Sequence, residues 1–99
     1  MRLEYAAAAV NEIDEALAYY QAIDQKLSSR LVRELEESMQ MILRFPLGWR
    51  PLEGGLRQRR VKFFPFVIVY QPREDVVVII AFANTHRRPD YWRDRVESK

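Results

Sequence analysis

The chain has 99 residues, of which 48% are hydrophobic and 30% charged, and it contains no cysteine. This length and hydrophobic content predict one folded domain over residues 1–99 and exclude a disordered chain. The lack of cysteine excludes disulfides and thiolate metal sites. No apolar run is long enough for a signal peptide or a membrane span, so we expect a cytoplasmic protein without a membrane partner.

Charge is distributed unevenly along the chain. The formal net charge is +2, but residues 1–49 have a net charge of −3 and residues 50–99 a net charge of +5. Thirteen of the sixteen basic residues are arginine, whose planar guanidinium pairs with phosphates and carboxylates. The basic second half therefore indicates an acidic partner, either nucleic acid or the acidic face of another protein.

Two stripes of apolar residues predict two helices in the first half. After a short strand over residues 1–5, alanines and a spacing of three and four predict a helix over residues 7–23. A second helix follows Asp24, which suits an N-cap, and ends at Phe45 before Pro46. The stripes consist of Val10, Ile13, Leu17 and Tyr20, and of Leu27, Leu31, Leu35, Met39 and Ile42. With almost no linker, the two helices should form an antiparallel hairpin.

The sequence of the second half predicts a loop over residues 46–55 and three strands, over residues 56–62, 66–70 and 76–83. The last two are apolar on both faces and therefore central, and the three should form an antiparallel meander. Even positions of the last strand should share one face, namely Val78, Ile80, Phe82, Asn84 and His86. Residues 88–92 should start a short helix, with Pro89 in its first turn. The order β-α-α-β-β-β-(α) predicts an α+β fold, a helical hairpin packed on a small twisted antiparallel sheet.

Arginines are the main candidates for binding. Strand alternation puts Arg57 and Arg59 on one face of the 56–62 strand and Arg60 and Lys62 on the other. We interpret at least one of the first pair as a partner contact, through phosphates if the partner is nucleic acid. The alternative for the second pair is protection of an edge strand.

Few residues suit catalysis. His86, beside two arginines, suits a general base, and Glu53 is the nearest candidate acid, although a surface or capping histidine is the ordinary alternative. Tyr91 and Trp92 either stack on a nucleic-acid base or, as we favour, pin the terminal helix to the sheet. The sequence has no glycine-rich phosphate loop, metal-spaced His/Cys cluster or nucleophile triad, so we expect neither a metal nor a cofactor.

The stretch Gly55-Leu56-Arg57, the run FPFVIVY over residues 64–70 and the ending HRRPDYW over residues 86–92 resemble the RelE/ParE family of bacterial toxins. These are toxins of type II toxin–antitoxin systems, of the plasmid stabilisation type, and the resemblance covers nearly the whole chain. RelE-like members cut mRNA on the ribosome without metal, whereas ParE-like members bind DNA gyrase and are not nucleases. The sequence His-Arg-Arg-Pro after the last strand resembles the ParE branch.

The resemblance implies a growth inhibitor that binds DNA gyrase and is not an enzyme. Arg57 matches a strand arginine of the family, and Arg87 and Arg88 match its basic group after the last strand. The binding candidates are thus Arg57, Arg59, Arg60, Arg87, Arg88 and Trp92. The alternatives are a ribosome-dependent endoribonuclease acting on mRNA through His86, Glu53 and Tyr91, or a non-toxic binding module. The implied partner is a cognate antitoxin, whose acidic segment would lie across the basic sheet face or along the helical hairpin.

Overall fold

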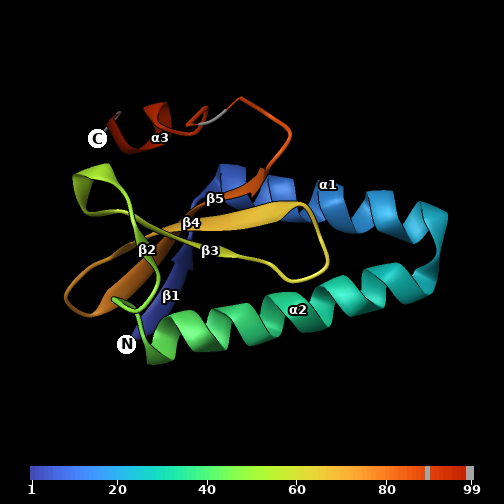
Figure 1. Cartoon of the computed structure of the whole chain (residues 1–99), viewed down its shortest axis with the longest axis horizontal. Coiled ribbons are helices and arrows are strands. Elements are labelled where there is room, and N and C mark those ends of the chain that lie inside the picture. Colours follow the sequence, from blue (N-terminus) through green and yellow to red (C-terminus); the bar gives the residue numbers. More distant parts are fainter. Residues whose placement is uncertain (89, 98–99) are drawn as a thin grey trace.

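The computed structural model describes residues 1–88 and 90–97 and places two long helices beside a five-stranded sheet (Figure 1). The elements are β1 (Arg2–Tyr5), α1 (Ala7–Ile23), α2 (Gln25–Arg44), β2 (Arg50–Pro51), η1 (Glu53–Gly55), β3 (Arg57–Arg60), β4 (Phe66–Pro72), β5 (Val76–Asn84) and α3 (Asp94–Glu97). Within these described residues, no helix is both long and apolar enough to cross a membrane.

The α+β arrangement and the helical hairpin are confirmed. α1 and α2 run antiparallel and are joined at one end by a single residue, Asp24, whose Oδ1 accepts a hydrogen bond from the Lys26 N–H at 2.9 Å. α2 ends at Arg44, and Phe45 caps it before Pro46, as the sequence predicts. Both helices pack on one side of the sheet, which we call its helix face.

The sheet is mixed, not wholly antiparallel. Its strand order is β1-β5-β4-β3-β2, and β1 pairs with β5 in parallel, whereas the other pairs are antiparallel. The sequence gives no signal for this, because a short alternating strand pairs equally well in either direction. The two-residue strand β2 lies in the expected loop over 46–55 and pairs with β3.

Both faces of the sheet are buried at its centre. The first core cluster lies between the helices and the sheet and includes Leu31, Ile42, Ile68, Tyr70, Ile79 and Phe82. The second lies on the opposite side, which we call the open face, and consists of Leu56, Val69, Ile80, Ala81, Ala83 and Trp92. β4 and β5 are therefore central strands, as their apolar sequences predict.

A register shift in β5 overturns the prediction that its even positions share one face. Val69 is paired with Ala81, but Tyr70 is paired with Ile79, so Ile80 is the extra residue of a β-bulge. The alternation of side chains reverses there. Ile80 consequently packs on the open face and Phe82 on the helix face.

The C-terminal region also differs from the sequence prediction. Helix α3 begins at Asp94, and residues 90–93 form turns instead of the expected start of a helix. Asp90 has a left-handed φ of 56°, which a right-handed helix does not contain. Pro89, expected in the first helical turn, lies outside the described residues.

Candidate functional site

A groove of about 770 Å³ crosses the open face of the sheet at the end where β5 stops. We call it the open-face groove, and it brings together residues from β2, η1, β3, the end of β5 and the C-terminal segment, which we define as residues 90–95. Its charged and aromatic lining consists of Glu53, Arg60, Arg87, Arg88, Asp90, Tyr91, Trp92 and Arg93. Four arginines thus face two carboxylates, and the groove is basic.

Arg93 forms ion pairs with both carboxylates of the groove. Its side chain lies 3.9 Å from the Glu53 carboxylate and 3.7 Å from that of Asp90. Arg60 and Arg88 are exposed, and no ion pair joins either of them to another of the described residues. These two guanidinium groups are therefore available to an anionic partner.

Trp92 forms part of the groove wall but is itself 6% exposed. It belongs to the second core cluster, together with Val69 and Ile80. This packing is what the anchor interpretation predicts for an aromatic residue near a chain end. Its contribution to binding a partner stays a prediction.

Arg57 and Arg59 lie on the helix face and do not line the open-face groove. They are paired with Tyr70 and Ile68, so their side chains share the face of those core residues. One guanidinium nitrogen of Arg57 donates to the carbonyls of Leu47 and Trp49, at 2.9 and 3.0 Å. The guanidinium carbon of Arg59 lies 4.2 Å from the centre of the Trp49 ring. Both arginines hold the loop that follows α2.

Tyr70, a buried residue of β4, also holds the loop that follows α2. Its side chain is fully buried, and its hydroxyl donates to the Pro46 carbonyl at 2.8 Å. Burial raises the pKa of Tyr70 to about 12, although Arg57 and Arg59 oppose the shift. The ring is thus neutral at physiological pH and serves as a hydrogen-bond donor.

His86 and Glu53 lie on opposite sides of the sheet. Glu53 borders the open-face groove, whereas His86 borders a hollow of about 370 Å³ next to Tyr19, Phe66 and Phe82 on the helix face. We call this second space the helix-side hollow. The structure therefore does not bring the two together as an acid–base pair. Among residues 1–88 and 90–97, no group of three His, Asp or Glu side chains is arranged to hold a metal.

Tyr91 borders both spaces, and its hydroxyl donates to the carboxylate of Glu12 on α1. Burial and this hydrogen bond raise the pKa of Tyr91 to about 12. The guanidinium of Arg87 lies 3.8 Å from the centre of the Tyr91 ring and 3.9 Å from the Glu12 carboxylate. Arg87 thus has partners within the chain, whereas no ion pair joins Arg60 or Arg88 to another of the described residues.

Glu12 is the residue that the sequence analysis missed. Its carboxylate also accepts hydrogen bonds from Arg95 and from the backbone N–H of Phe82. Burial acts to raise the pKa of Glu12, but hydrogen bonds from Arg95, Tyr91 and Phe82 outweigh it and leave the pKa below its usual value. In the structure Glu12 is three residues after Ala9 and four before Ala16, both buried, and so lies on the inward face of α1.

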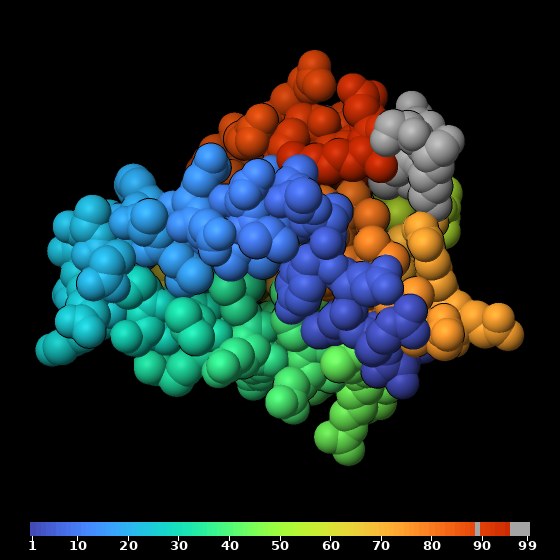
Figure 2. All heavy atoms as spheres, turned by 180° about the vertical axis from the view of Figure 1, so that it is seen from behind, coloured from blue at the N-terminus to red at the C-terminus, as the bar shows by residue number. Residues whose placement is uncertain are grey.

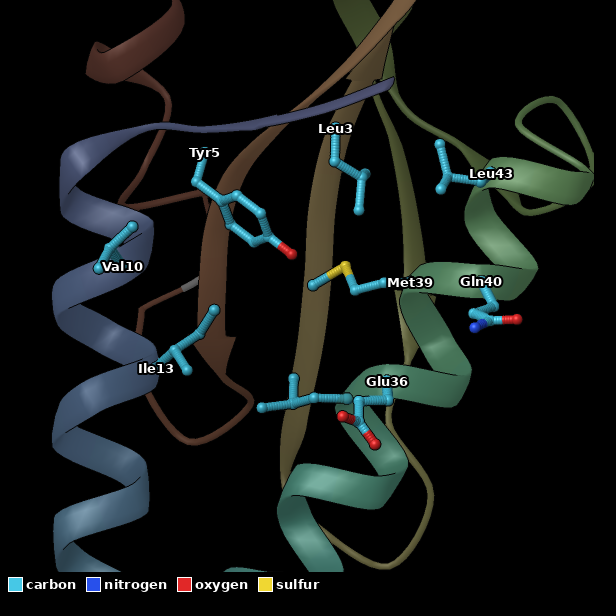
Figure 3. Close-up of a pocket in the computed structure, with 9 residues that line it drawn as sticks. Leu3, Tyr5, Val10, Ile13, Glu36, Met39, Gln40 and Leu43 are labelled. Carbon is cyan, nitrogen blue, oxygen red and sulfur yellow. The ribbon is translucent and has the colours of Figure 1, made fainter. Parts of the chain in front are cut away.

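A third space separates the two helices near β1. This hairpin groove has a volume of about 710 Å³ and is lined mainly by apolar side chains, with Glu36 and Gln40 on α2 as its polar members. Figure 3 shows the Leu3, Ile13 and Met39 side chains directed into the space between the helices. Tyr5 and Val10 at its border are partly exposed, so the hairpin groove offers apolar surface to solvent.

These features define a small α+β fold that has a basic groove on one side of its sheet and an apolar groove on the other. A family model described as "ParE toxin of type II toxin-antitoxin system, parDE" matches residues 3–89. The chain belongs to this family of ParE toxins.

Two solved structures share the fold. The chromosomal ParDE TA system from P. aeruginosa aligns at 17% identity with a TM-score of 0.73, over 87% of this chain and 97% of that chain. The YoeB/ParE toxin from Agrobacterium tumefaciens aligns at 18% identity with a TM-score of 0.60, over 85% and 98%. At these identities the likeness shows the fold alone. No curated protein matches the sequence significantly.

Proposed function

We propose that this ParE-family toxin stops growth by binding DNA gyrase in the cytoplasm, without catalysis, through the open-face groove. The observation that carries this proposal is the exposed pair Arg60 and Arg88 at the edges of a basic groove. The separation of Glu53 and His86 on opposite sides of the sheet supports binding over cleavage, because general acid–base chemistry needs both groups within reach of one substrate.

The proposal includes a cognate antitoxin that neutralises the toxin. Membership of the family of type II toxin–antitoxin systems supports such a partner. We place its acidic segment in the open-face groove, where carboxylates would pair with Arg60 and Arg88. Antitoxin and gyrase would then compete for the same surface, which is a simple basis for neutralisation.

Gyrase supercoiling with purified protein tests the proposal. The wild-type protein should inhibit at a stoichiometric ratio, and Arg60→Ala and Arg88→Ala should each raise the half-inhibitory concentration about tenfold, equivalent to about 1.4 kcal/mol. Arg33→Ala is the matched control, because Arg33 is exposed on α2 far along the sequence from the groove residues. Supercoiling that is unchanged by an excess of wild-type protein would refute gyrase as the target.

One observation supports the alternative of a ribosome-dependent endoribonuclease. His86, Arg87 and Tyr91 line the same helix-side hollow, so a histidine, an arginine and a tyrosine lie near one another. This function predicts codon-positioned cuts in translated mRNA that disappear in His86→Ala. A non-toxic binding module, in contrast, would leave growth normal after induced expression.

A further inference from the structure

The edge of β5 beyond β1 is completed by side chains instead of a strand. β1 pairs only with Val76–Ile79 of β5, and the Ala6 N–H donates to the Ile79 carbonyl at 2.9 Å as the chain turns into α1. Beyond that point, the Phe82 N–H donates to Glu12 at 3.0 Å, and the Ile80 carbonyl accepts from Arg95 at 3.1 Å. The Glu12–Arg95 pair thus satisfies backbone groups that the end of β1 leaves open.

Glu12 also holds the C-terminal segment. Two nitrogens of Arg95 donate to its two carboxylate oxygens, each at 2.9 Å, and the Tyr91 hydroxyl donates to one of them. The Glu12 side chain is 12% exposed, so these charge-assisted bonds are largely shielded from water. In Figure 2 the C-terminal segment lies directly against α1, although the two are about 80 residues apart in sequence.

The segment that Glu12 holds builds one wall of the open-face groove. Tyr91 and Trp92 line that groove, and Arg87 stacks on the Tyr91 ring. Helix α3 in this part of the chain has four residues, which is far too short to be stable without side-chain contacts. The position of the wall therefore depends on the packing of Trp92 and on the bonds to Glu12.

We propose that Glu12 is a positioning residue for target binding: its carboxylate fixes the C-terminal segment against the end of β5 and so holds Arg87, Tyr91 and Trp92 in the arrangement that the target recognises. This inference rests on the proposed function of the open-face groove. It assigns to α1 a part in recognition even though Glu12 does not line that groove.

The substitution Glu12→Gln removes one of the two acceptor oxygens and the negative charge with almost no change in shape. The amide keeps one oxygen, but its NH₂ group would face the donors of Arg95, Tyr91 or Phe82, and its neutral charge would remove the ionic attraction between residue 12 and Arg95. Arg95→Gln breaks the same pair from the other side and leaves α1 intact. Asp14→Asn is the matched control, because Asp14 is an exposed acid on the same helix.

The experiment measures separately the packing of the C-terminal segment against the sheet and the inhibition of gyrase. All variants carry Trp49→Phe, so that Trp92 is the only tryptophan, since the chain has two. Trp92 emission and its quenching by acrylamide report whether the segment stays packed, circular dichroism reports folding, and supercoiling assays report inhibition. We expect Glu12→Gln and Arg95→Gln to red-shift the emission, increase quenching, and raise the half-inhibitory concentration by about tenfold or more, as for the loss of a charge-assisted bond. Asp14→Asn should have the same emission, quenching and half-inhibitory concentration as the Trp49→Phe parent protein.

Two results would overturn the inference. Trp92 could stay as shielded in folded Glu12→Gln and Arg95→Gln as in the parent, which would mean that Glu12 does not hold the segment. Alternatively, the segment could be released while inhibition is unchanged, which would mean that its position does not matter for the target. If the parent protein itself does not inhibit gyrase, the proposed target is wrong, and growth arrest after induction replaces supercoiling as the readout of the same variants.

Discussion

Replacing Arg57 by alanine tests whether the arginines of β3 serve the fold or the partner. The structure ties Arg57 to the loop after α2 through two hydrogen bonds, to the Leu47 and Trp49 carbonyls. It shares this face with Arg59, whereas Arg60 points into the open-face groove. We therefore expect Arg57→Ala to destabilise the protein and Arg60→Ala to weaken inhibition.

The expected loss in the free energy of unfolding of Arg57→Ala follows from the two hydrogen bonds of Arg57. A hydrogen bond from a charged donor contributes roughly 1.5–3 kcal/mol when buried, and two half-exposed bonds should together contribute about 1.5 kcal/mol after screening. For a domain of this size, such a loss lowers the melting temperature by about 6–12 °C. Arg60 is exposed and has no ion pair to another described residue, so Arg60→Ala should change the free energy of unfolding by less than about 0.5 kcal/mol.

Urea unfolding followed by circular dichroism, together with supercoiling inhibition at 25 °C, separates the two roles. Arg57→Ala should shift the urea midpoint and leave the half-inhibitory concentration of the folded protein within about twofold of wild type, which is a difference of about 0.4 kcal/mol. The reasoning is refuted if Arg57→Ala unfolds at the wild-type midpoint and yet fails to inhibit. In that case Arg57 would contact the target directly, as the family resemblance implies.

Two further predictions concern the core beneath the site. Tyr70→Phe should cost about 1 kcal/mol through the lost bond to Pro46, measured by urea unfolding at pH 7. Burial raises the pKa of Tyr70 from 10.0 to about 12, so the stability that its neutral form contributes is present below pH 10 and is lost as the pH rises to about 12. The urea midpoint of the wild-type protein should therefore fall over that pH range, and the midpoint of Tyr70→Phe should fall less steeply. Leu31→Ala, at a fully buried position of α2, should cost about 2–5 kcal/mol, whereas Val32→Ala, at a 40% exposed neighbour, should cost under about 1 kcal/mol. A similar loss at both positions would contradict the assigned core face.

The helices were predictable because their signals are local. The apolar stripes and the caps act within a few residues, and the structure has α1 and α2 where the spacing predicts them. Asp24 and Pro46 fixed the ends for the same reason. The bulge at Ile80 was not predictable, since an uninterrupted run of apolar residues carries no mark of where the alternation reverses.

The site was predictable only in part. The alternation of β3 correctly separated Arg57 and Arg59 from Arg60. It did not show that the loop after α2 folds back and occupies the guanidinium of Arg57, because the contact depends on the path of a loop with no period of its own. The placement of Glu53 and His86 on opposite faces depends likewise on tertiary structure.

Charge counted along the sequence overstates the basic surface that a partner meets. Arg95 and Arg93 add to the positive net charge of the second half, but Arg95 pairs with Glu12 of the acidic first half, and Arg93 pairs with Glu53 and Asp90. The charge asymmetry thus serves two purposes: part of it joins the C-terminal segment to α1, and in the open-face groove another part is displayed at Arg60 and Arg88. Because a partner in the open-face groove exchanges counter-ions with the groups displayed there, the salt dependence of its binding should follow these two arginines and not the net charge of +5.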